Sequence, residues 1–320
     1  MEQLEKLTHG EETLMLKNNI KRKNKGDRGE LIFYSTLIAL PILQIIIFYF
    51  YVNFNSILLC FKDWDTINSK ASWVGFDNFK ELWNDVENKL LIDAFKNSIL
   101  VWICVSFIGT FLSILFAYYI FKKWAAGKLF KFFLFLPSVV PSILFVMIYM
   151  FFMDEAIPEY MREVFHYPMT KGGFFSGAYD SILPPVLFFN VWVCFGSQIL
   201  IYTGAMDQIS PDILEAGKLD GVSSVQEFFQ IVVPIILPTI STFVIASVAT
   251  IFTNQANLYA FKGADVAWED STLGYYLYTL VKDAGKQDRY GYASALGVVC
   301  TLIALPLTFG VRKLLDRGDD

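Results

Sequence analysis

Six long apolar stretches, separated by shorter polar segments, dominate the pattern along the 320-residue chain. They cover residues 31–51, 98–121, 132–153, 182–202, 231–252 and 293–311, and each holds few or no charged residues. A stretch of this length predicts a transmembrane helix, because about 20 residues at ~1.5 Å per residue cross a hydrocarbon core ~30 Å thick. The pattern therefore predicts an all-α membrane protein with six transmembrane helices.

Composition favours this interpretation over a large soluble protein with buried helices. Hydrophobic residues make up 55% of the chain and charged residues 18%, whereas soluble domains average about 25% charged. The first apolar stretch follows a charged head, is too long for the apolar core of a signal peptide, and has no small-residue cleavage pattern behind it. We therefore expect a retained helix, and three parts: an N-terminal segment 1–30, a membrane domain 31–311 and a tail 312–320.

The distribution of Lys and Arg predicts which side of the membrane each loop occupies. The two ends and the loops 122–131 and 207–230 share one side and carry 15 of them, against 11 in the longer opposite loops 62–97, 154–181 and 257–290. This predicts that both termini are cytoplasmic. In the outer loops we expect one short amphipathic helix, around 78–86. The loop 207–230 departs from the charge rule, since it holds one Lys and five carboxylates.

The first half of this acidic loop has the start and stop signals of a short helix. Ser210 is a suitable N-cap, and Pro211 fits the first helical position, where a missing N–H costs nothing. Gly221 is a natural residue after the C-cap. We expect a helix of about nine residues between these signals, with an acidic first turn that suits the helix dipole.

A second helix is predicted to follow and to enter the membrane. Ser224-Val-Gln-Glu227 matches a capping box with Ser224 as N-cap, and Pro234 and Pro238 predict kinks or a break beyond it. The acidic short helix is a poor match for helices resting on lipid headgroups, which favour Lys and Arg on their polar face. Docking into a groove of another protein is the alternative that we favour.

The same segment resembles the cytoplasmic "EAA" loop of permease subunits of bacterial ATP-binding-cassette importers. The matching residues are Glu215-Ala216-Gly217-Lys218-Leu219-Asp220-Gly221, followed by Ile231 and Pro234; Gly217 replaces the usual second Ala, and Val233 the Leu before Pro. The resemblance implies that the short helix is a coupling helix seated in a cleft of an ATPase subunit. The coupling residues that it implies are Asp212, Leu214, Glu215, Ala216, Gly217, Asp220 and Gly221.

Five further stretches resemble the carbohydrate-uptake branch, of maltose and multiple-sugar permeases. They are WVGFDNFKEL at 73–82, FLPSVVPS at 135–142, NVWV at 190–193, STLGYYLY at 271–278 and GYASALG at 291–297. The resemblance implies the type I importer fold of six transmembrane helices, and a pathway for an oligosaccharide. The substrate-pathway residues that it implies are Ser142, Asn190, Trp192, Ser247 and Asn254.

The residue types lend these pathway positions independent support. Amides within membrane spans usually face a bundle interior or a water-filled cavity, and they donate and accept hydrogen bonds as sugar hydroxyls require. Interhelical hydrogen bonds are the alternative for the Asn and Ser residues. Gln255 and Asn257 are weaker candidates at the outer end of the span.

The sequence lacks the motif G-x-x-x-x-G-K-[ST], as well as H-E-x-x-H and G-x-S-x-G. We therefore expect a non-enzymatic subunit with no cofactor or metal of its own, and ATP with Mg²⁺ on partner subunits. The four Cys stand singly and suggest neither disulfides nor metal ligands. The expected partners are a second permease, two ATPase subunits, a solute-binding protein, an oligosaccharide and the lipid bilayer, without nucleic acid.

These expectations place the chain in the bacterial cytoplasmic membrane. An importer of the same build for another polar solute, such as a glycerophosphodiester, is the closest alternative. A secondary transporter or channel is a more distant one, because ion coupling usually places ionisable residues at mid-membrane, and these spans hold almost none.

Overall fold

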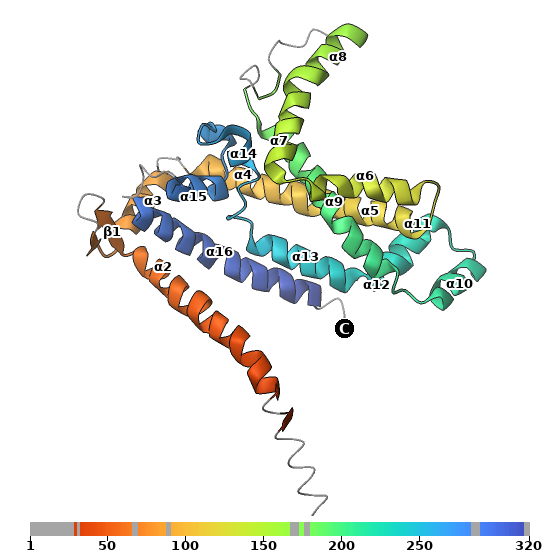
Figure 1. The fold of residues 1–320 in the computed structure, drawn as a ribbon, viewed down its shortest axis with the longest axis horizontal. Coiled ribbons are helices and arrows are strands. Elements are labelled where there is room, and N and C mark those ends of the chain that lie inside the picture. The colour runs from red at the N-terminus through yellow and green to blue at the C-terminus, as the bar shows by residue number, and fades with distance from the viewer. Residues whose placement is uncertain are drawn as a thin grey trace, which may run out of the picture. The chain divides into compact units, whose positions relative to one another are not determined.

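The computed structural model describes residues 29–30, 33–65, 70–87, 91–166, 173–175, 180–282 and 289–316. Most of these residues are helical (Figure 1). The chain divides into two compact units, Met1–Leu59 and Cys60–Asp320, which are described separately. The predicted segment 1–30 lies outside the described residues except for 29–30, and of the tail 312–320 only 312–316 is described.

The first unit holds one apolar helix, Phe33–Leu59, of 27 residues. It runs through a wider π-helical stretch, η1 (Ile45–Val52), into α2 (Asn53–Leu59). Almost every side chain along it is exposed within the unit, including large apolar ones such as Phe48 and Phe50. A helix that is apolar on all sides is stable in lipid, which confirms the first predicted span and extends it by eight residues beyond its predicted end at 51.

The second unit begins with a hairpin and a short helix, at the end that we call the outer end after its predicted side of the membrane. Strands β1 (Lys62–Asp65) and β2 (Lys70–Trp73) pair antiparallel, and α3 (Asp77–Glu87) follows. The predicted amphipathic helix is therefore confirmed. Asn78 holds it in place, because its side-chain amide donates to the carbonyls of Cys60 (2.9 Å) and Lys62 (3.0 Å).

Three long helices run without a sharp break through the second unit. The first is Ile92–Phe121, made of α4 (Ile92–Ile103), the π-helical η2 (Cys104–Gly109) and α5 (Thr110–Phe121). The second is α9 (Leu183–Met206), and the third is α16 (Tyr290–Asp316). They confirm the predicted spans at 98–121, 182–202 and 293–311, and each is longer than predicted.

The predicted continuous helix over 132–153 is wrong. The structure has α6 (Gly127–Val139) and α7 (Ser142–Phe151), and the axes of the two halves differ by 99°. Val140 is extended (ψ 134°) because it precedes Pro141, which disfavours the helical conformation in the residue before it. Beyond α7 the chain continues through η3 (Phe152–Ala156) into α8 (Ile157–Val164).

The predicted span over 231–252 is also bent, as its prolines suggested. It consists of α11 (Ser224–Glu227), η4 (Phe228–Val232), α12 (Val233–Ile235) and α13 (Leu237–Ala249), with a bend of 67° at Ile236. Pro238 has no N–H to donate, so the helical hydrogen bonding is interrupted there. Among the described residues, four continuous helices are long and apolar enough to cross a membrane, or six if each bent pair counts as one span.

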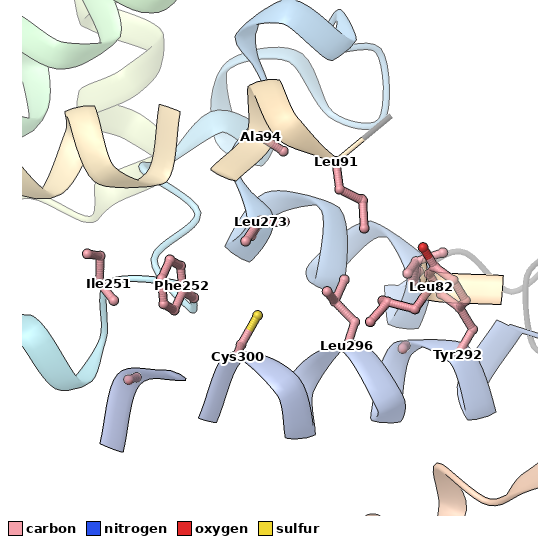
Figure 2. Packing of buried hydrophobic residues seen from close by; sticks show 12 residues of the cluster. Leu82, Leu91, Ala94, Ile251, Phe252, Leu273, Tyr292, Leu296 and Cys300 are labelled. Atoms are coloured by element: carbon pink, nitrogen blue, oxygen red, sulfur yellow. The ribbon is translucent and has the colours of Figure 1, made fainter. Parts of the chain in front are cut away.

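The two ends of the second unit carry different elements (Figure 1). At one end lie β1, α3 and α15 (Leu273–Lys282), with the short helices α14 (Leu258–Lys262) and η5 (Trp268–Asp270) nearby in the sequence. At the other end lie α10 (Pro211–Leu219) and α11. One apolar cluster joins Leu82 of α3 to Leu296 and Cys300 of α16 (Figure 2), so the outer helix is packed onto a membrane span.

Candidate functional site

The predicted coupling segment is a short helix with defined ends. We call residues 207–230 the elbow. Helix α10 has Ser210 at its N-cap and Pro211 at the first position, as predicted, although the Ser210 side chain makes no capping bond. At the other end, Gly221 has φ +76°, and the N–H groups of Gly221 and Val222 donate to the carbonyls of Lys218 (3.1 Å) and Gly217 (3.0 Å). These two bonds form a Schellman motif, which ends the helix at the predicted residue.

Helix α10 lies against the body of the protein through two residues. Gly217 is buried, and a Cβ on it would come within 2.9 Å of the Ile231 Cδ1 atom. Leu214 is half-buried on an apolar cluster that includes Met206 and Val232. Gly217 therefore allows α10 to pack closely against Ile231 of the same chain.

The opposite side of α10 faces outward. Of the predicted coupling residues, five are exposed: Asp212, Glu215, Ala216, Asp220 and Gly221. Two apolar side chains stand among the carboxylates, Ile213 at 46% and Leu219 at 88% exposure. An outward surface that mixes carboxylates with exposed aliphatic groups suits contact with another protein.

The cap of the next helix lies one residue earlier than predicted. The N-cap of α11 is Ser223, whose Oγ accepts from the N–H of Gln226 (3.3 Å), while Gln226 Oε1 accepts from the N–H of Ser223 (3.0 Å). Gln serves in a capping box as well as Glu does. The assignment to Ser224 and Glu227 is therefore wrong, and the Glu227 carboxylate is used elsewhere.

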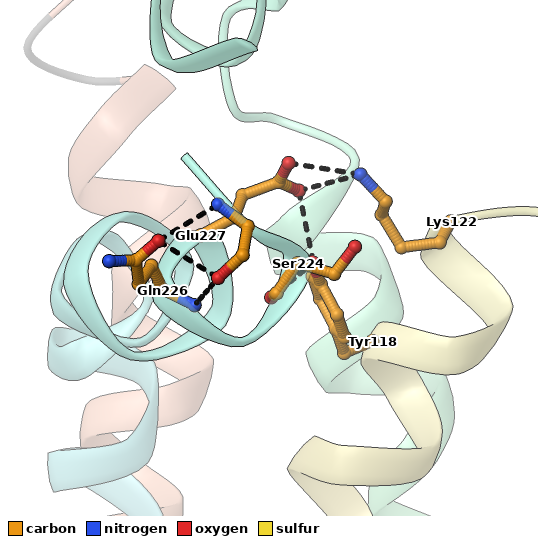
Figure 3. A network of polar contacts seen from close by, with 6 residues as sticks. Tyr118, Lys122, Ser224, Gln226 and Glu227 are labelled. Carbon is orange, nitrogen blue, oxygen red and sulfur yellow. Dashed lines mark hydrogen bonds and ion pairs between the residues drawn. The ribbon is translucent and has the colours of Figure 1, made fainter. Parts of the chain in front are cut away.

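Glu227 takes part in a buried polar cluster that the sequence analysis missed (Figure 3). Its Oε1 and Oε2 atoms accept from the Lys122 ammonium at 2.8 and 3.0 Å. The Tyr118 hydroxyl lies 3.1 Å from Glu227 Oε1 and 3.0 Å from the Ser224 carbonyl. The available signal was a charge just outside each of two apolar stretches, 98–121 and 231–252, in loops predicted to share one side of the membrane.

Among the predicted substrate-pathway residues, Asn190 has its amide engaged within the protein. Its Nδ2 donates to the carbonyls of Val186 (2.8 Å) and Ala256 (2.9 Å), and its Oδ1 accepts from Asn257 Nδ2 (2.8 Å). Ala256 and Asn257 both have positive φ, at 51° and 57°. Asn190 thus ties the irregular segment 254–257 to α9.

That segment also presents polar groups of its own. Asn254 is exposed, and its Oδ1 accepts from the N–H of Ala256 (2.8 Å). The Oε1 atom of Gln255 is buried and has no partner among the described residues. Gly274 packs so closely that a Cβ would lie 2.5 Å from the Asn254 carbonyl carbon. Asn190 and Asn254 therefore lie together at segment 254–257. In this segment the buried Gln255 Oε1 atom is a hydrogen-bond acceptor without a partner among the described residues.

The other three pathway residues have different surroundings. Trp192 packs edge-on against Phe145 (5.2 Å between ring centres) and lines an apolar cavity of about 600 Å³. Ser247 accepts from Trp102 Nε1 (3.1 Å) and donates to a backbone carbonyl (2.7 Å). Ser142 is exposed at the start of α7. Within the described part of the chain, no hydrogen bond joins Ser142 or Ser247 to segment 254–257.

The outer segment after 254–257 is held by buried polar contacts. The Asp270 carboxylate accepts from the Ser181 hydroxyl and from the N–H of Ile182 (2.9 Å). The Asn97 amide donates to the carbonyls of Glu269 (2.7 Å) and Ser271 (3.0 Å).

Nearby, the Tyr275 hydroxyl donates to the Gly263 carbonyl (2.9 Å). Burial raises the pKa of this phenol above its ordinary value. The hydroxyl therefore keeps its proton, and the bond persists, throughout the physiological pH range.

Comparison with known proteins gives concordant results. The model of the family described as "Binding-protein-dependent transport system inner membrane component" matches residues 109–318. The probable ABC transporter permease protein YurN of Bacillus subtilis is 23% identical over 288 residues, which are 89% of this chain and 96% of the relative. The multiple sugar-binding transport system permease protein MsmF of Streptococcus mutans is 21% identical over 268 residues, 84% of this chain and 90% of the relative.

A solved structure shares the fold. It is a chain of a bacterial ABC transporter involved in the import of the acidic polysaccharide alginate, with a TM-score of 0.71 and 19% identity. The match covers 92% of this chain and 99% of that chain.

Proposed function

The chain belongs to the family of inner membrane components of binding-protein-dependent transport systems, and from this premise we propose that it is the permease subunit of an ATP-driven oligosaccharide importer. With a second permease it forms the translocation pathway, and a solute-binding protein delivers the sugar to the outer loops. It is a multi-pass protein of the bacterial cytoplasmic membrane. The termini and the elbow lie on the cytoplasmic side in this proposal, as the Lys and Arg distribution favours.

The observation that carries the proposal is the geometry of α10. This helix begins at Pro211 and ends in a Schellman motif. It lies on the body through Leu214 and Gly217, and it exposes Ile213 and Leu219 between carboxylates. We propose that a cytoplasmic ATPase subunit receives this surface. ATP binding can change the permease only through different affinities for its two states, and a nearly complete switch needs ~5.5 kcal/mol.

ATP and Mg²⁺ are assigned to the partner subunits. The sequence has no G-x-x-x-x-G-K-[ST] motif to cradle phosphates. In the described part of the chain, no three His, Cys, Asp or Glu side chains are grouped so as to hold a metal ion. This chain is therefore proposed as a non-enzymatic subunit whose task is to form the pathway and transmit the movement.

The oligosaccharide assignment is supported by segment 254–257 and by the named substrates of the relatives. Asn254 is exposed, and Gln255 offers a buried acceptor without a partner, so both suit sugar hydroxyls. Asn190 holds the segment, and Trp192 lies two residues further along α9. Ser142 and Ser247 stay predictions as pathway residues.

Docking is tested by Leu219→Asp in the purified complex. A carboxylate at this 88%-exposed position would have to lose its hydration on docking, so we expect the ATPase subunits to dissociate during purification. The matched control is Leu314→Asp, which changes a 71%-exposed residue near the end of α16, outside the elbow. Unchanged co-purification in Leu219→Asp would contradict docking at α10.

The substrate class is tested on the cognate solute-binding protein by calorimetric titration with maltotriose, an alginate trisaccharide and glycerophosphocholine. Binding of either glycan supports the proposal. Binding of glycerophosphocholine alone would overturn the sugar class and leave the importer architecture in place.

A further inference from the structure

The ion pair between Lys122 and Glu227 differs from the other ion pairs of the described residues. Their side chains are 18% and 5% exposed, and the N–O distances are 2.8 and 3.0 Å. The other pairs (Lys80–Asp77, Lys96–Asp93 and Arg289–Glu81) all expose at least a third of each side chain. An exposed pair contributes little, whereas separating a buried one leaves a charge without solvent or partner.

The pair joins two elements that are 105 residues apart in the sequence. Lys122 is the C-cap of α5, and the chain turns at the next residue, Lys123, with φ +53°. Glu227 is the last residue of α11. The Tyr118 ring packs 5.0 Å from the ring of Phe228, the first residue of η4. The ion pair (Figure 3) and this ring packing both hold the segment around Glu227 to the end of α5.

The bend at Ile236 separates this assembly from the rest of its own span. Ile236 leaves the helical conformation (φ −89°, ψ 4°), and α13 sets off at 67° to the preceding helix. Helix α11 thus has a direct ion pair with α5, whereas η4, α12 and the bend at Ile236 lie between it and α13.

Helix α5 in turn packs along α9. Ile114 and Ala117 of α5 share an apolar cluster with Tyr202 and Met206 of α9, and Ser113 Oγ donates to Gln198 Oε1 (3.3 Å). Further along α9, Asn190 holds segment 254–257. A contiguous series of packed and bonded groups thus runs from the elbow to the proposed sugar-contacting segment.

We infer that Lys122 and Glu227 are positioning residues that make the elbow and the cytoplasmic end of α5 move as one body, with Ile236 as the hinge. Movement of α10 is then passed to α5 and α9, while α13 changes its angle to the elbow. The inference rests on the proposed function, because an ATPase subunit must supply the movement.

The test uses spin-label distances in the assembled transporter, whose native cysteines are replaced by alanine. Labels are placed at Lys123→Cys, Lys218→Cys and Thr242→Cys, all at exposed positions on α5's end, α10 and α13. Distances are measured without nucleotide and after trapping with Mg-ATP and vanadate. We expect the 218–242 distance to change on trapping and the 123–218 distance to stay constant.

Glu227→Gln should release this constraint. Removing one partner of a buried ion pair shifts the equilibrium between joined and separated states by about a hundredfold or more. The 123–218 distance should then change on trapping. Exchanging the charges with Lys122→Glu and Glu227→Lys should restore its constancy, and Tyr118→Phe should have a smaller effect. Lys80→Gln, which breaks an exposed pair, is the control and should leave both distances as in the parent.

A merely structural ion pair would change the melting temperature without making the 123–218 distance depend on nucleotide. The inference is overturned if trapping changes the 123–218 distance in the parent as much as the 218–242 distance. It is also overturned if Glu227→Gln behaves as the parent does. If the Glu227→Gln complex does not assemble, the 123–218 distances in the charge-exchange variant and in Tyr118→Phe still test the inference. If the purified parent complex showed no vanadate-sensitive ATP hydrolysis, the proposed function would be overturned instead.

Discussion

The outer end of the second unit and the elbow are held by different kinds of contact. At the outer end, buried side chains bond to backbone groups far away in the sequence. Asp270 accepts from Ile182, and Asn97 donates to the carbonyls on either side of Asp270. The elbow is held by one buried ion pair, by the Tyr118 hydroxyl and by the packing of Leu214, Gly217 and Phe228. The rest of α10 is exposed.

The difference indicates which region can move. Each outer contact satisfies a buried backbone group, so shifting that region would expose several unpaired groups at once. The elbow can turn about Ile236 while its few contacts to α5 stay intact. We therefore regard the outer end as internally rigid, and the bend at Ile236 as the place where a partner changes the angle between the elbow and α13.

The largest expected effect is that of Asp270→Ala. The substitution leaves the Ser181 hydroxyl and the Ile182 N–H without their acceptor in a buried place, at a cost of about 3 kcal/mol or more. We expect the melting temperature of the purified complex to fall by several degrees. Glu269→Ala removes a neighbouring carboxylate that is exposed and should have little effect. Equal effects of the two substitutions would contradict a fixed outer end.

Asn190→Ala should have the next largest effect. It leaves the Ala256 carbonyl and the Asn257 amide without their partner, which costs about 2 kcal/mol and loosens segment 254–257. Both melting temperature and sugar uptake should fall. Asn254→Ala should lower uptake with little change in melting temperature, because its side chain is exposed. If Asn190→Ala and Asn254→Ala lowered the melting temperature equally, Asn254 would also stabilise the fold.

Gly221→Val should act on the elbow alone. The position has open space around it, but its φ of +76° strains a β-branched residue by about 1–2 kcal/mol. We expect uptake per ATP hydrolysed to fall while the melting temperature stays near that of the parent. Gly204→Val is the matched control, since it also has open space but no positive φ. Near-normal uptake per ATP in Gly221→Val would count against coupling through the elbow.

Ser223→Ala should have the smallest effect. It removes the cap of α11 and should cost about 1 kcal/mol, seen as faster hydrogen exchange in residues 224–228. Ser224→Ala should leave exchange unchanged, because its side chain caps nothing. Faster exchange in Ser224→Ala and unchanged exchange in Ser223→Ala would instead support Ser224 as the N-cap, as predicted from the sequence.

Much of this fold could be predicted because lipid demands long apolar helices, and the sequence shows them directly. The start and end of α10 could also be predicted. Pro211 fits the first helical position because it has no N–H, and Gly221 adopts the positive φ that ends the helix. The break in the third span was not predicted, although Pro137 and Pro141 lie there, because apolar content alone gives no bend angle.

Contacts between residues far apart in the chain could not be predicted from the sequence. Lys122 and Glu227 lie in separate loops, 122–131 and 207–230, and one sequence alone does not indicate which charges of two loops form an ion pair. The family resemblance, supported by residue type, identified Asn190 as a pathway residue, but only the structure shows that its amide is bonded to Ala256 and Asn257. The capping box was misplaced by one residue because two adjacent serines both fit the pattern, and the use of Glu227 elsewhere decides between them.

The most direct test of the account is photo-crosslinking from Leu219, replaced by a benzophenone amino acid, in the assembled transporter in membranes. This side chain is 88% exposed on the outward face of α10. We predict a covalent adduct with the ATP-binding subunit, and none from the same probe at Leu314. Adducts with phospholipid alone from position 219 would contradict the account.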